Sequence, residues 1–384
     1  MKKFIILSLA FVLLLSFAAM ATNTRVNTMG YNGMIVIDDS NIEMFPSRLI
    51  EFSNLAIGEF SSSDFREFGM IWKVSDNSNW NMGAFFSTQT GLGDFGFVPS
   101  FGMYPTYFND RIDFYYGREL GNNKFGFRFE YQNAGYEETD TLSTNFDDTE
   151  KLNHMNFTFG LTEGSGQWDV AVNFGIGSFT NEENDSTINE PDGISNFGVV
   201  GRYFMVKNPN YTLVPHAGIS MDKFGWKDVG ADYAEVYKMT YIELGCGFNY
   251  TPSNNVLAVL DVGFALDSWK EEYTDATTTD EYKYATTTIP YFKLGLDAEV
   301  FKWLDVRFGM QSDWHREKEE INYNNLNEWK YNYVYNESIV GLGFHWNRLH
   351  IDTEANPDFF IEGPDFLSGA SEDMSWSLSV LYEL

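Results

Sequence analysis

The sequence predicts an all-β fold, a single transmembrane antiparallel β-barrel of about sixteen strands. The first supporting observation is composition: 17% of the 384 residues are aromatic and 33 are glycine, but only 10 are proline. Aromatic residues favour strands, and Gly, Asn, Asp and Thr supply turns. The second is a period-two pattern in about sixteen segments from residue 53 onward, with no amphipathic helix of three turns between them. The third is an alternation of short and long connections.

The chain begins with the layout of a secretory signal peptide. MKKFIILSLAFVLLLSFAAMA, residues 1–21, has two lysines, an apolar stretch, and Ala19 and Ala21 on either side of Met20. We therefore expect export and cleavage after Ala21. No later stretch reaches the roughly 18 apolar residues of a membrane helix, so the exported chain either stays soluble or enters a membrane as strands. The single Cys246 excludes an internal disulfide and is expected on the outer face.

Seven short connections alternate with eight long ones. The short ones are 75–79, 121–123, 163–166, 207–210, 251–255, 301–302 and 347–348. The long ones are 61–66, 91–110, 134–151, 180–195, 225–238, 267–284, 315–332 and 354–374. An outer-membrane barrel has short periplasmic turns and long external loops, whereas a soluble sandwich has no reason to sort its loops. This count gives sixteen strands, and fourteen also fit because the first strand, near 54–60, is short.

The hairpin at 156–179, NFTFGLTEGSGQWDVAVNFGIGSF, shows the two faces of such strands. A soluble sandwich would turn its apolar face inward, and a membrane barrel would turn it toward lipid. In the barrel, Asp169 and Asn173 point inward, EGSG is a periplasmic turn, and the lipid-facing residues are Phe157, Phe159, Val170, Val172 and Phe174. Tryptophans near the strand ends predict two bands at the membrane interfaces: Trp80, Trp168, Trp303 and Trp346 beside short turns, and Trp226, Trp269, Trp314 and Trp376 beside long loops.

The opposite face of the strands is polar and is expected to line the lumen. Its charged residues are Arg111, Asp113, Arg128, Glu130, Asp169, Glu243, Asp261, Lys293, Asp297, Asp305 and Arg307. The bases Arg111, Arg128, Lys293 and Arg307 can pair with Asp113, Glu130, Asp297 and Asp305. These residues either form a structural lining or a polar path with a mild preference for cations or neutral solutes. Glycines on this face either leave room near the wall or help the sheet to bend.

The formal net charge of −30 argues against a nucleic-acid partner, which requires a basic surface. Most carboxylates fall in the long connections, and solubility and mutual repulsion of external loops explain them. Two alternatives stay open: calcium bound at NEENDSTINEPDG (181–193), and divalent ions that bridge the acids to lipopolysaccharide.

Nothing in the sequence indicates an enzyme. There is no nucleophile elbow. The five histidines, at 154, 216, 315, 345 and 350, show no ligand spacing with one another. We therefore expect no catalytic residue, no cofactor and no metal site. A Ser–His pair brought together by folding, as in a barrel hydrolase, is a much weaker alternative.

Two regions resemble known barrels. TRVNTMGYNGMIVIDDSNIEMFPSRL at 24–49 resembles the opening of FadL-type and PorV-like proteins, with FPSRL where those families have an Asn-Pro-Ala-Gly-like stretch. The ending, GLGFHWNRLHIDTEANPDFFIEGPDFLSG and then MSWSLSVLYEL, also resembles their last strands. The resemblance implies an N-terminal plug or hatch at residues 22–52 inside a barrel formed by residues 53–384. It also implies that assembly machinery reads the last strand, where Tyr382 and Leu384 match the alternating hydrophobic signal.

These observations predict a protein of the outer membrane of a Gram-negative bacterium that passively transports a small or hydrophobic solute. The resemblance to the FadL type implies that a hydrophobic small molecule is collected by an apolar loop: Phe95, Phe97, Phe101, Tyr104, Tyr107 and Phe108. The same loop could instead fold into the lumen as a constriction. Expected partners are outer-membrane lipid, lipopolysaccharide and the assembly machinery. The alternative is a non-transporting barrel that anchors or shuttles secreted or surface proteins, as the PorV-like resemblance implies.

Overall fold

The computed structural model describes residues 23–62, 66–75, 78–90, 108–140, 146–183, 186–208, 210–230, 233–253, 255–275, 279–323, 325–355 and 375–384. The predicted signal peptide and nearly all of the apolar loop at 91–108 lie outside these ranges. Among the described residues, no helix is long and apolar enough to cross a membrane.

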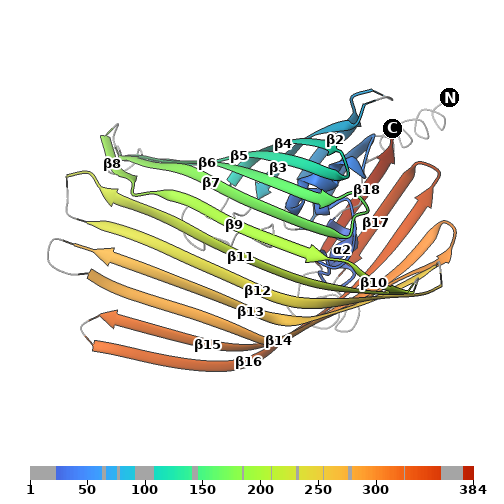
Figure 1. The fold of residues 1–384 in the computed structure, drawn as a ribbon. Helices are drawn as coiled ribbons and strands as arrows, with labels where there is room; N and C mark the ends of the chain where they lie inside the picture. Colours follow the sequence, from blue (N-terminus) through green and yellow to red (C-terminus); the bar gives the residue numbers. More distant parts are fainter. Residues whose placement is uncertain are drawn as a thin grey trace, which may run out of the picture.

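The described chain forms one closed antiparallel barrel (Figure 1). Strand β1 pairs with both β2 and β18, which closes the sheet. β8, β9 and β10 follow one another between β7 and β11 and together make one barrel strand, so the eighteen segments form sixteen strands. The segments are β1 (Leu55–Ser61), β2 (Arg66–Lys73), β3 (Trp80–Thr90), β4 (Phe108–Leu120), β5 (Asn123–Asp140), β6 (Phe146–Glu163), β7 (Trp168–Glu183), β8 (Ser186–Pro191), β9 (Ile194–Tyr203), β10 (Met205–Asn208), β11 (Tyr211–Asp228), β12 (Ala234–Ser253), β13 (Val256–Thr274), β14 (Thr279–Phe301), β15 (Leu304–Tyr323), β16 (Asn325–Trp346), β17 (Leu349–Ala355) and β18 (Trp376–Glu383).

The outer surface of the barrel carries large apolar side chains. In the β6–β7 hairpin, Phe159, Val170 and Phe174 are 39%, 40% and 44% exposed, whereas Asp169 is fully buried on the inner face. The same alternation exposes Phe114, Leu244, Leu260, Leu294, Leu296, Val306 and Phe308 on other strands. A water-soluble monomer rarely exposes such a large apolar surface, but a barrel in lipid requires one. In the structure the apolar side chains of the hairpin thus lie outside and Asp169 lies inside, and their contact with lipid stays a prediction.

The predicted long connections are mostly strand, which corrects the reading of the loops. β14 has 23 residues and β16 has 22, about twice the 9–11 that cross a bilayer. The segments at 134–151, 180–195, 225–238, 267–284 and 315–332 therefore largely continue the ladders. Their polar side chains pair across and along the strands: Glu281 on β14 contacts Lys270 on β13 and Lys283 on its own strand, and the hydrogen bonds from both lysines lower the pKa of Glu281 to about 2. The many charged, Thr and Tyr residues of these segments suggested loops, but such residues also occur in strand pairs that are exposed to water.

The predicted tryptophan band at the long-loop end is partly wrong. Trp226 and Trp269 face inward and pack against Phe224 and Tyr237. They belong to an inner cluster, which we call the aromatic cluster and which also contains Leu152, Phe179 and Ile194. Neighbouring residues on a strand point to opposite faces, so a shift of one residue turns a side chain from outside to inside. The position of a tryptophan near a strand end therefore did not determine which face it lies on.

The N-terminal segment, residues 23–52, lies against the inner wall (Figure 1, dark blue). It contains helices α2 (Asn23–Asn27) and α3 (Asn41–Met44) and the 3-10 helix η1 (Pro46–Ile50). η1 contacts β3, β4, β5 and β6, while α2 contacts β16, β17 and β18. Pro46 begins η1, where its missing N–H is not needed.

Inward-facing glycines allow this close approach. A Cβ atom at Gly126 would overlap the backbone of Pro46 and Ser47, and one at Gly309 would overlap Gly30. Gly247, Gly295 and Gly341 meet Ile35, Met29 and Thr28 in the same way. We expected these glycines either to leave room near the wall or to help the sheet bend. The structure shows that they leave room near the wall for the N-terminal segment.

A nitroxide at Val172 tests the direction of the hairpin. In a Cys246→Ala background, a label on Val172→Cys should collide with oxygen dissolved in lipid, because this face is apolar, while a label on Asn173→Cys should collide with a water-soluble nickel complex. Paramagnetic relaxation in proteoliposomes measures both. Water contact at position 172 would reverse the two faces.

Substitution of Gly126 by alanine tests the fit of the N-terminal segment. The added methyl group must displace Pro46 and Ser47, which should cost about 1–3 kcal/mol as overpacking and allow trypsin to cut after the buried Arg48. In Gly201→Ala, where the Cβ finds ordinary contacts from 3.4 Å, proteolysis should match the parent. Equal proteolysis of both variants would show that the close fit is not required.

Candidate functional site: the barrel interior

A cavity of about 310 Å³ lies between the N-terminal segment and the wall. The segment contributes apolar side chains, among them Val26, Met34 and Met44. The wall contributes polar ones: Arg128, Glu130, Gln132, His154, Asn156, Tyr241, Glu243 and Lys293. The cavity can therefore accept a small molecule that has both an apolar and a polar part.

On the wall formed by β2 to β9, arginines and acids are paired. Arg111 contacts Asp113 at 2.8 Å and also contacts Glu67. Arg128 contacts Asp113 at 2.7 Å and Glu130 at 2.5 Å. These residues are at least 95% buried, so each charge needs the compensation that its partners give. We call this surface the paired wall.

Asp169 joins the N-terminal segment to the paired wall. Its carboxylate accepts hydrogen bonds from Arg48 in η1 at 2.9 Å and from Arg202 in β9 at 2.7 Å. Arg202 also donates to the carbonyl oxygens of Gly33, Met34 and Val36. The sequence predicted Asp169 in the lumen but missed both arginines, because their partners are more than thirty residues away along the chain.

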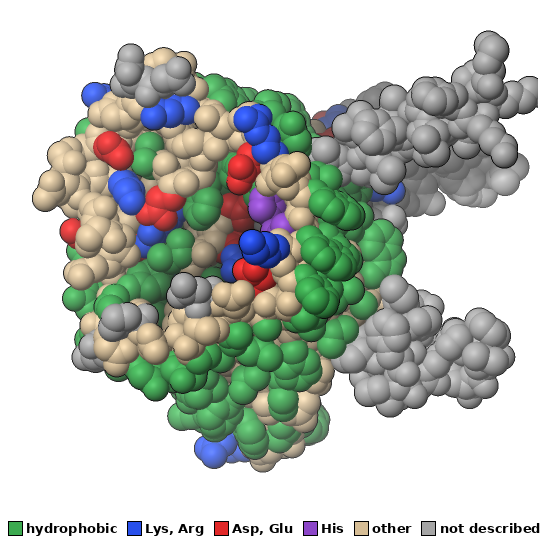
Figure 2. Space-filling model, turned by 90° about the vertical axis from the view of Figure 1, so that its right-hand side faces the viewer, with side chains coloured by type: hydrophobic (Ala, Val, Ile, Leu, Met, Phe, Trp, Pro, Cys, Tyr) green, Lys and Arg blue, Asp and Glu red, His purple; other side chains and the backbone are tan. Residues whose placement is uncertain are grey.

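A second cavity, of about 540 Å³, lies at the turn end of the barrel. Figure 2 shows acidic, basic and histidine side chains around the centre of this end. Arg25 bridges Asp38 at 2.5 Å and Asp297 at 3.1 Å, and Arg307 contacts Asp297, Asp305 and Asp352. Burial, and then the charge of Asp38, raise the pKa of Asp39 well above its usual range. His345 and His350, which gave no ligand signal in sequence, are hydrogen-bonded across the β16–β17 turn.

The wall formed by β11 to β15 carries several inward acids for which the described residues show no arginine or lysine partner, and we call it the acid-rich wall. Its inward carboxylates are Asp222, Glu243, Asp261, Asp267 and Asp313. Asp222, Asp267 and Asp313 each have at least one buried oxygen without a hydrogen-bond partner among the described residues. An oxygen of this kind favours a cation or a hydrogen-bond donor beside it. The aromatic cluster continues this wall, since Phe224 lies two residues beyond Asp222 on β11.

The structure places every predicted lumen residue on the inner face. Arg111, Asp113, Arg128, Glu130, Asp169, Glu243, Asp261, Asp297 and Arg307 are buried, while Lys293 and Asp305 line the two cavities. All four predicted acid partners occur, but Lys293 lies over the ring of Tyr291 at 5.3 Å. Of the apolar loop, only the backbone of Phe108, at the start of β4, is described. Tyr382 lies in β18 and pairs with β1 and β17, and Leu384 donates its N–H to the carbonyl of Asn54.

Three potential metal ligands meet on the acid-rich wall. His216, Glu243 and Asp261 come from β11, β12 and β13, and one ligand atom from each lies within 4.8 Å of the others. The sequence missed this group because it depends on the register of three strands. The acidic stretch 181–193, considered for calcium, lies only partly within the described residues.

Comparison with known proteins gives distant likenesses. No family model and no curated protein matches the chain. The chain is similar to CdiB from Acinetobacter baumannii (11% identity, TM-score 0.42, 85% of this chain and 59% of that one) and to CdiB from Escherichia coli (10%, 0.43, 85% and 62%). It is also similar to the Pseudomonas putida toluene transporter TodX (10%, 0.41, 93% and 96%). The chain thus spans about three-fifths of the two CdiB chains. At these values the likeness defines no family, and the resemblance to FadL-type and PorV-like barrels stays a prediction.

Removal of the Asp169 carboxylate tests its linking role. Asp169→Ala should lower the free energy of unfolding by about 3–5 kcal/mol, because it leaves the buried Arg48 and Arg202 uncompensated. Glu190→Ala removes an exposed partner of Lys227 and should cost less than about 1 kcal/mol. Denaturant unfolding of the refolded barrels measures both. Similar losses would mean that Asp169 is not a special link.

Proposed function

We propose that this chain is an outer-membrane β-barrel, exported by a cleaved signal peptide, that passes a small solute. The observation that carries this proposal is a charged, cavity-containing interior enclosed by strands whose outer faces expose many large apolar side chains. A closed barrel satisfies its backbone within the bilayer, and its inner face is then free for a polar solute. Lipid and lipopolysaccharide would cover the outside, and assembly machinery would read the last strand.

The inner surfaces favour a solute that combines an apolar body with a cationic or hydrogen-bond-donating group. Unpartnered oxygens of Asp222, Asp267 and Asp313 attract positive charge. The partly buried rings of Trp226 and Trp269 offer adjacent apolar area and faces for cation–π contact. The apolar side chains Val26, Met34 and Met44 then line the cavity below.

The N-terminal segment would act as the plug of this pathway. It contacts strands on several sides and is held by Arg202, by Asp169 and by Asn249, which donates to the carbonyl of Ile35. Passage therefore requires part of the segment to shift. The link between Arg48 and Asp169 is a candidate for the contact that must open.

The same contacts support a second function, a sealed barrel that anchors or shuttles secreted or surface proteins. Hydrogen bonds from Arg202, Asn249 and Asn81 fix the segment from three parts of the wall. The long hairpins β13–β14 and β15–β16 carry rows of charged and tyrosine side chains that a protein partner could contact.

Electrical recording in planar bilayers tests transport. At pH 9, which ionises buried carboxyl groups, the parent should show a cation-preferring conductance, and Asp222→Asn with Asp267→Asn should lower the cation preference by about twofold or more, because it removes lumen charge. The matched control, Glu190→Gln with Glu281→Gln, removes two carboxylates that are paired with lysines and should leave the preference unchanged.

Two results would contradict transport. One is a parent barrel that inserts but conducts no ions and passes no small cation in liposome swelling. The other is an equal effect of the inner and control variants, which would place the selectivity elsewhere. A sealed barrel that also retains exported proteins in pull-down would support the anchoring function instead.

A further inference from the structure

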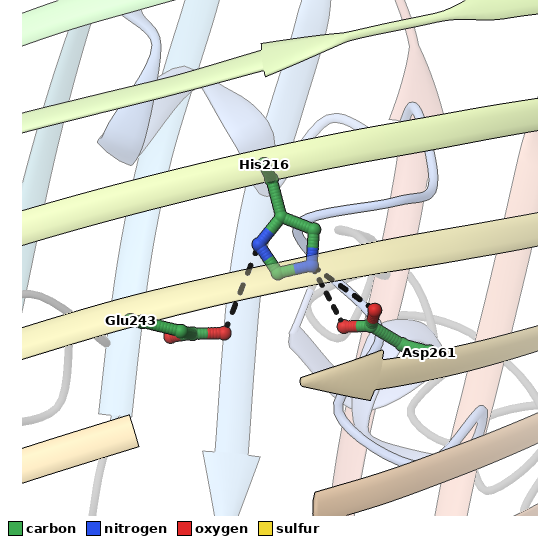
Figure 3. A group of neighbouring side chains, drawn as sticks. All are labelled: His216, Glu243 and Asp261. Atoms are coloured by element: carbon green, nitrogen blue, oxygen red, sulfur yellow. Dashed lines mark hydrogen bonds and ion pairs between the residues drawn. The ribbon is translucent and has the colours of Figure 1, made fainter. Parts of the chain in front are cut away.

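His216, Glu243 and Asp261 form a compact group on the inner face of three adjacent strands (Figure 3). All three residues are at least 94% buried. One nitrogen of the His216 ring, Nε2, lies 3.0 Å from both oxygens of Asp261. The other, Nδ1, lies 3.8 Å from Oε1 of Glu243.

Two glycines make the space for this group. A Cβ atom at Gly245 would overlap both the His216 ring and the hydroxyl of Tyr291, and one at Gly263 would overlap Tyr291. Gly245 is paired with His216 on one side and with Gly263 on the other. The imidazole of His216 and the phenol of Tyr291 can therefore lie over Gly245 and Gly263, where the wall has no side chains.

The geometry of this group leaves a place for a cation. An imidazole can offer the electron pair of one ring nitrogen to a metal ion. Nδ1 is buried, has no hydrogen-bond partner among the described residues, and faces a carboxylate oxygen. Two electron-pair donors that face each other repel unless a positive charge lies between them.

Glu243 is held in position by two hydroxyl groups. Tyr241 donates to Oε2 at 2.8 Å, and Tyr291 donates to Oε1 at 2.9 Å. Outer hydrogen bonds of this kind orient the ligands of metal sites. Glu243 also lines the 310 Å³ cavity, so an ion held there can be reached by water. Lys293 is the basic side chain nearby, over the Tyr291 ring, and the two carboxylates of the group outweigh its charge.

We propose that His216, Glu243 and Asp261 bind a divalent transition-metal ion of the Zn²⁺ type. The residues offer one ring nitrogen and one oxygen from each carboxylate, which is a donor set of catalytic and exchangeable zinc sites that leaves room for water. The imidazole selects such an ion over Ca²⁺ and Mg²⁺, which prefer oxygen alone. The site does not depend on the transport of a solute.

Metal titration of the full-length, untagged, folded barrel tests this site. His345 and His350 form a second histidine pair at the turn end, so the parent for all measurements is His345→Gln with His350→Gln. After removal of metal with EDTA, equilibrium dialysis should give one Zn²⁺ per chain. Co²⁺ in its place should give visible d–d absorption, whose energy and intensity report the coordination geometry of the bound ion.

Variants of the ligands and of their support should weaken binding in a graded way. His216→Gln and Glu243→Gln should each lower Zn²⁺ affinity by about tenfold or more. Tyr291→Phe keeps the ligands but removes an orienting hydrogen bond, so it should weaken binding less. The matched control is His315→Gln, a histidine on β15 beside Tyr333, which should bind Zn²⁺ like the parent. A shift between unboiled and boiled samples on a denaturing gel checks that every variant is folded.

Three results would overturn the proposal. They are a folded parent that binds no Zn²⁺, a His216→Gln variant with affinity within twofold of the parent, and binding of Ca²⁺ or Mg²⁺ as tight as that of Zn²⁺. In the first two cases a proton on Nδ1 supplies the positive charge between the ring and Glu243. Loss of conductance with normal Zn²⁺ binding would contradict transport alone, so the two proposals fail separately.

Discussion

The barrel interior is arranged around one constraint: the irregular backbone of the N-terminal segment is buried and its polar groups must be bonded. A short-helix segment leaves carbonyl groups that no ladder satisfies, and water is largely excluded from the contact. Arg202 donates hydrogen bonds to three of these carbonyl groups, and the carboxylate of Asp169 compensates the charge of Arg202. Asn81 and Asn249 do the same for Leu49 and Ile35. The segment and the wall are therefore parts of one folding unit.

The glycines of the inner face belong to the same constraint. Gly30 adopts a φ of 75°, open mainly to glycine, and lies against the backbone of Leu294 and Met310. Opposite it, Gly309 leaves room for its backbone. Backbone can approach backbone only where no side chain intervenes, so the absence of Cβ atoms on several strands sets where the segment can lie.

Charge compensation then divides the lumen into two unlike walls. Near the N-terminal segment, Arg48, Arg111, Arg128 and Arg202 are matched by acids. The acid-rich wall from β11 to β15 keeps carboxylate oxygens without partners. A stable scaffold and a surface suited to binding cations thus occupy different sectors of one sheet. Both proposals, for solute passage and for a metal ion, rest on that second sector.

The sequence by itself determined the class of fold, the inner and outer faces of the strands, and the seven short turns. These features follow from local rules, because side chains alternate along a strand and tight turns need particular residues. The predicted pairs of Arg111, Arg128 and Arg307 also followed, since their acid partners lie on the same or neighbouring strands.

Only the tertiary structure decided the rest. The links of Asp169 to Arg48 and Arg202, the inward direction of Trp226, and the group at His216 all depend on which strands meet and in what register. The length of the hairpins could not be predicted from the sequence either, because polar strands that extend into water have the composition of loops. Register is set by pairing between distant segments, and no local pattern encodes it.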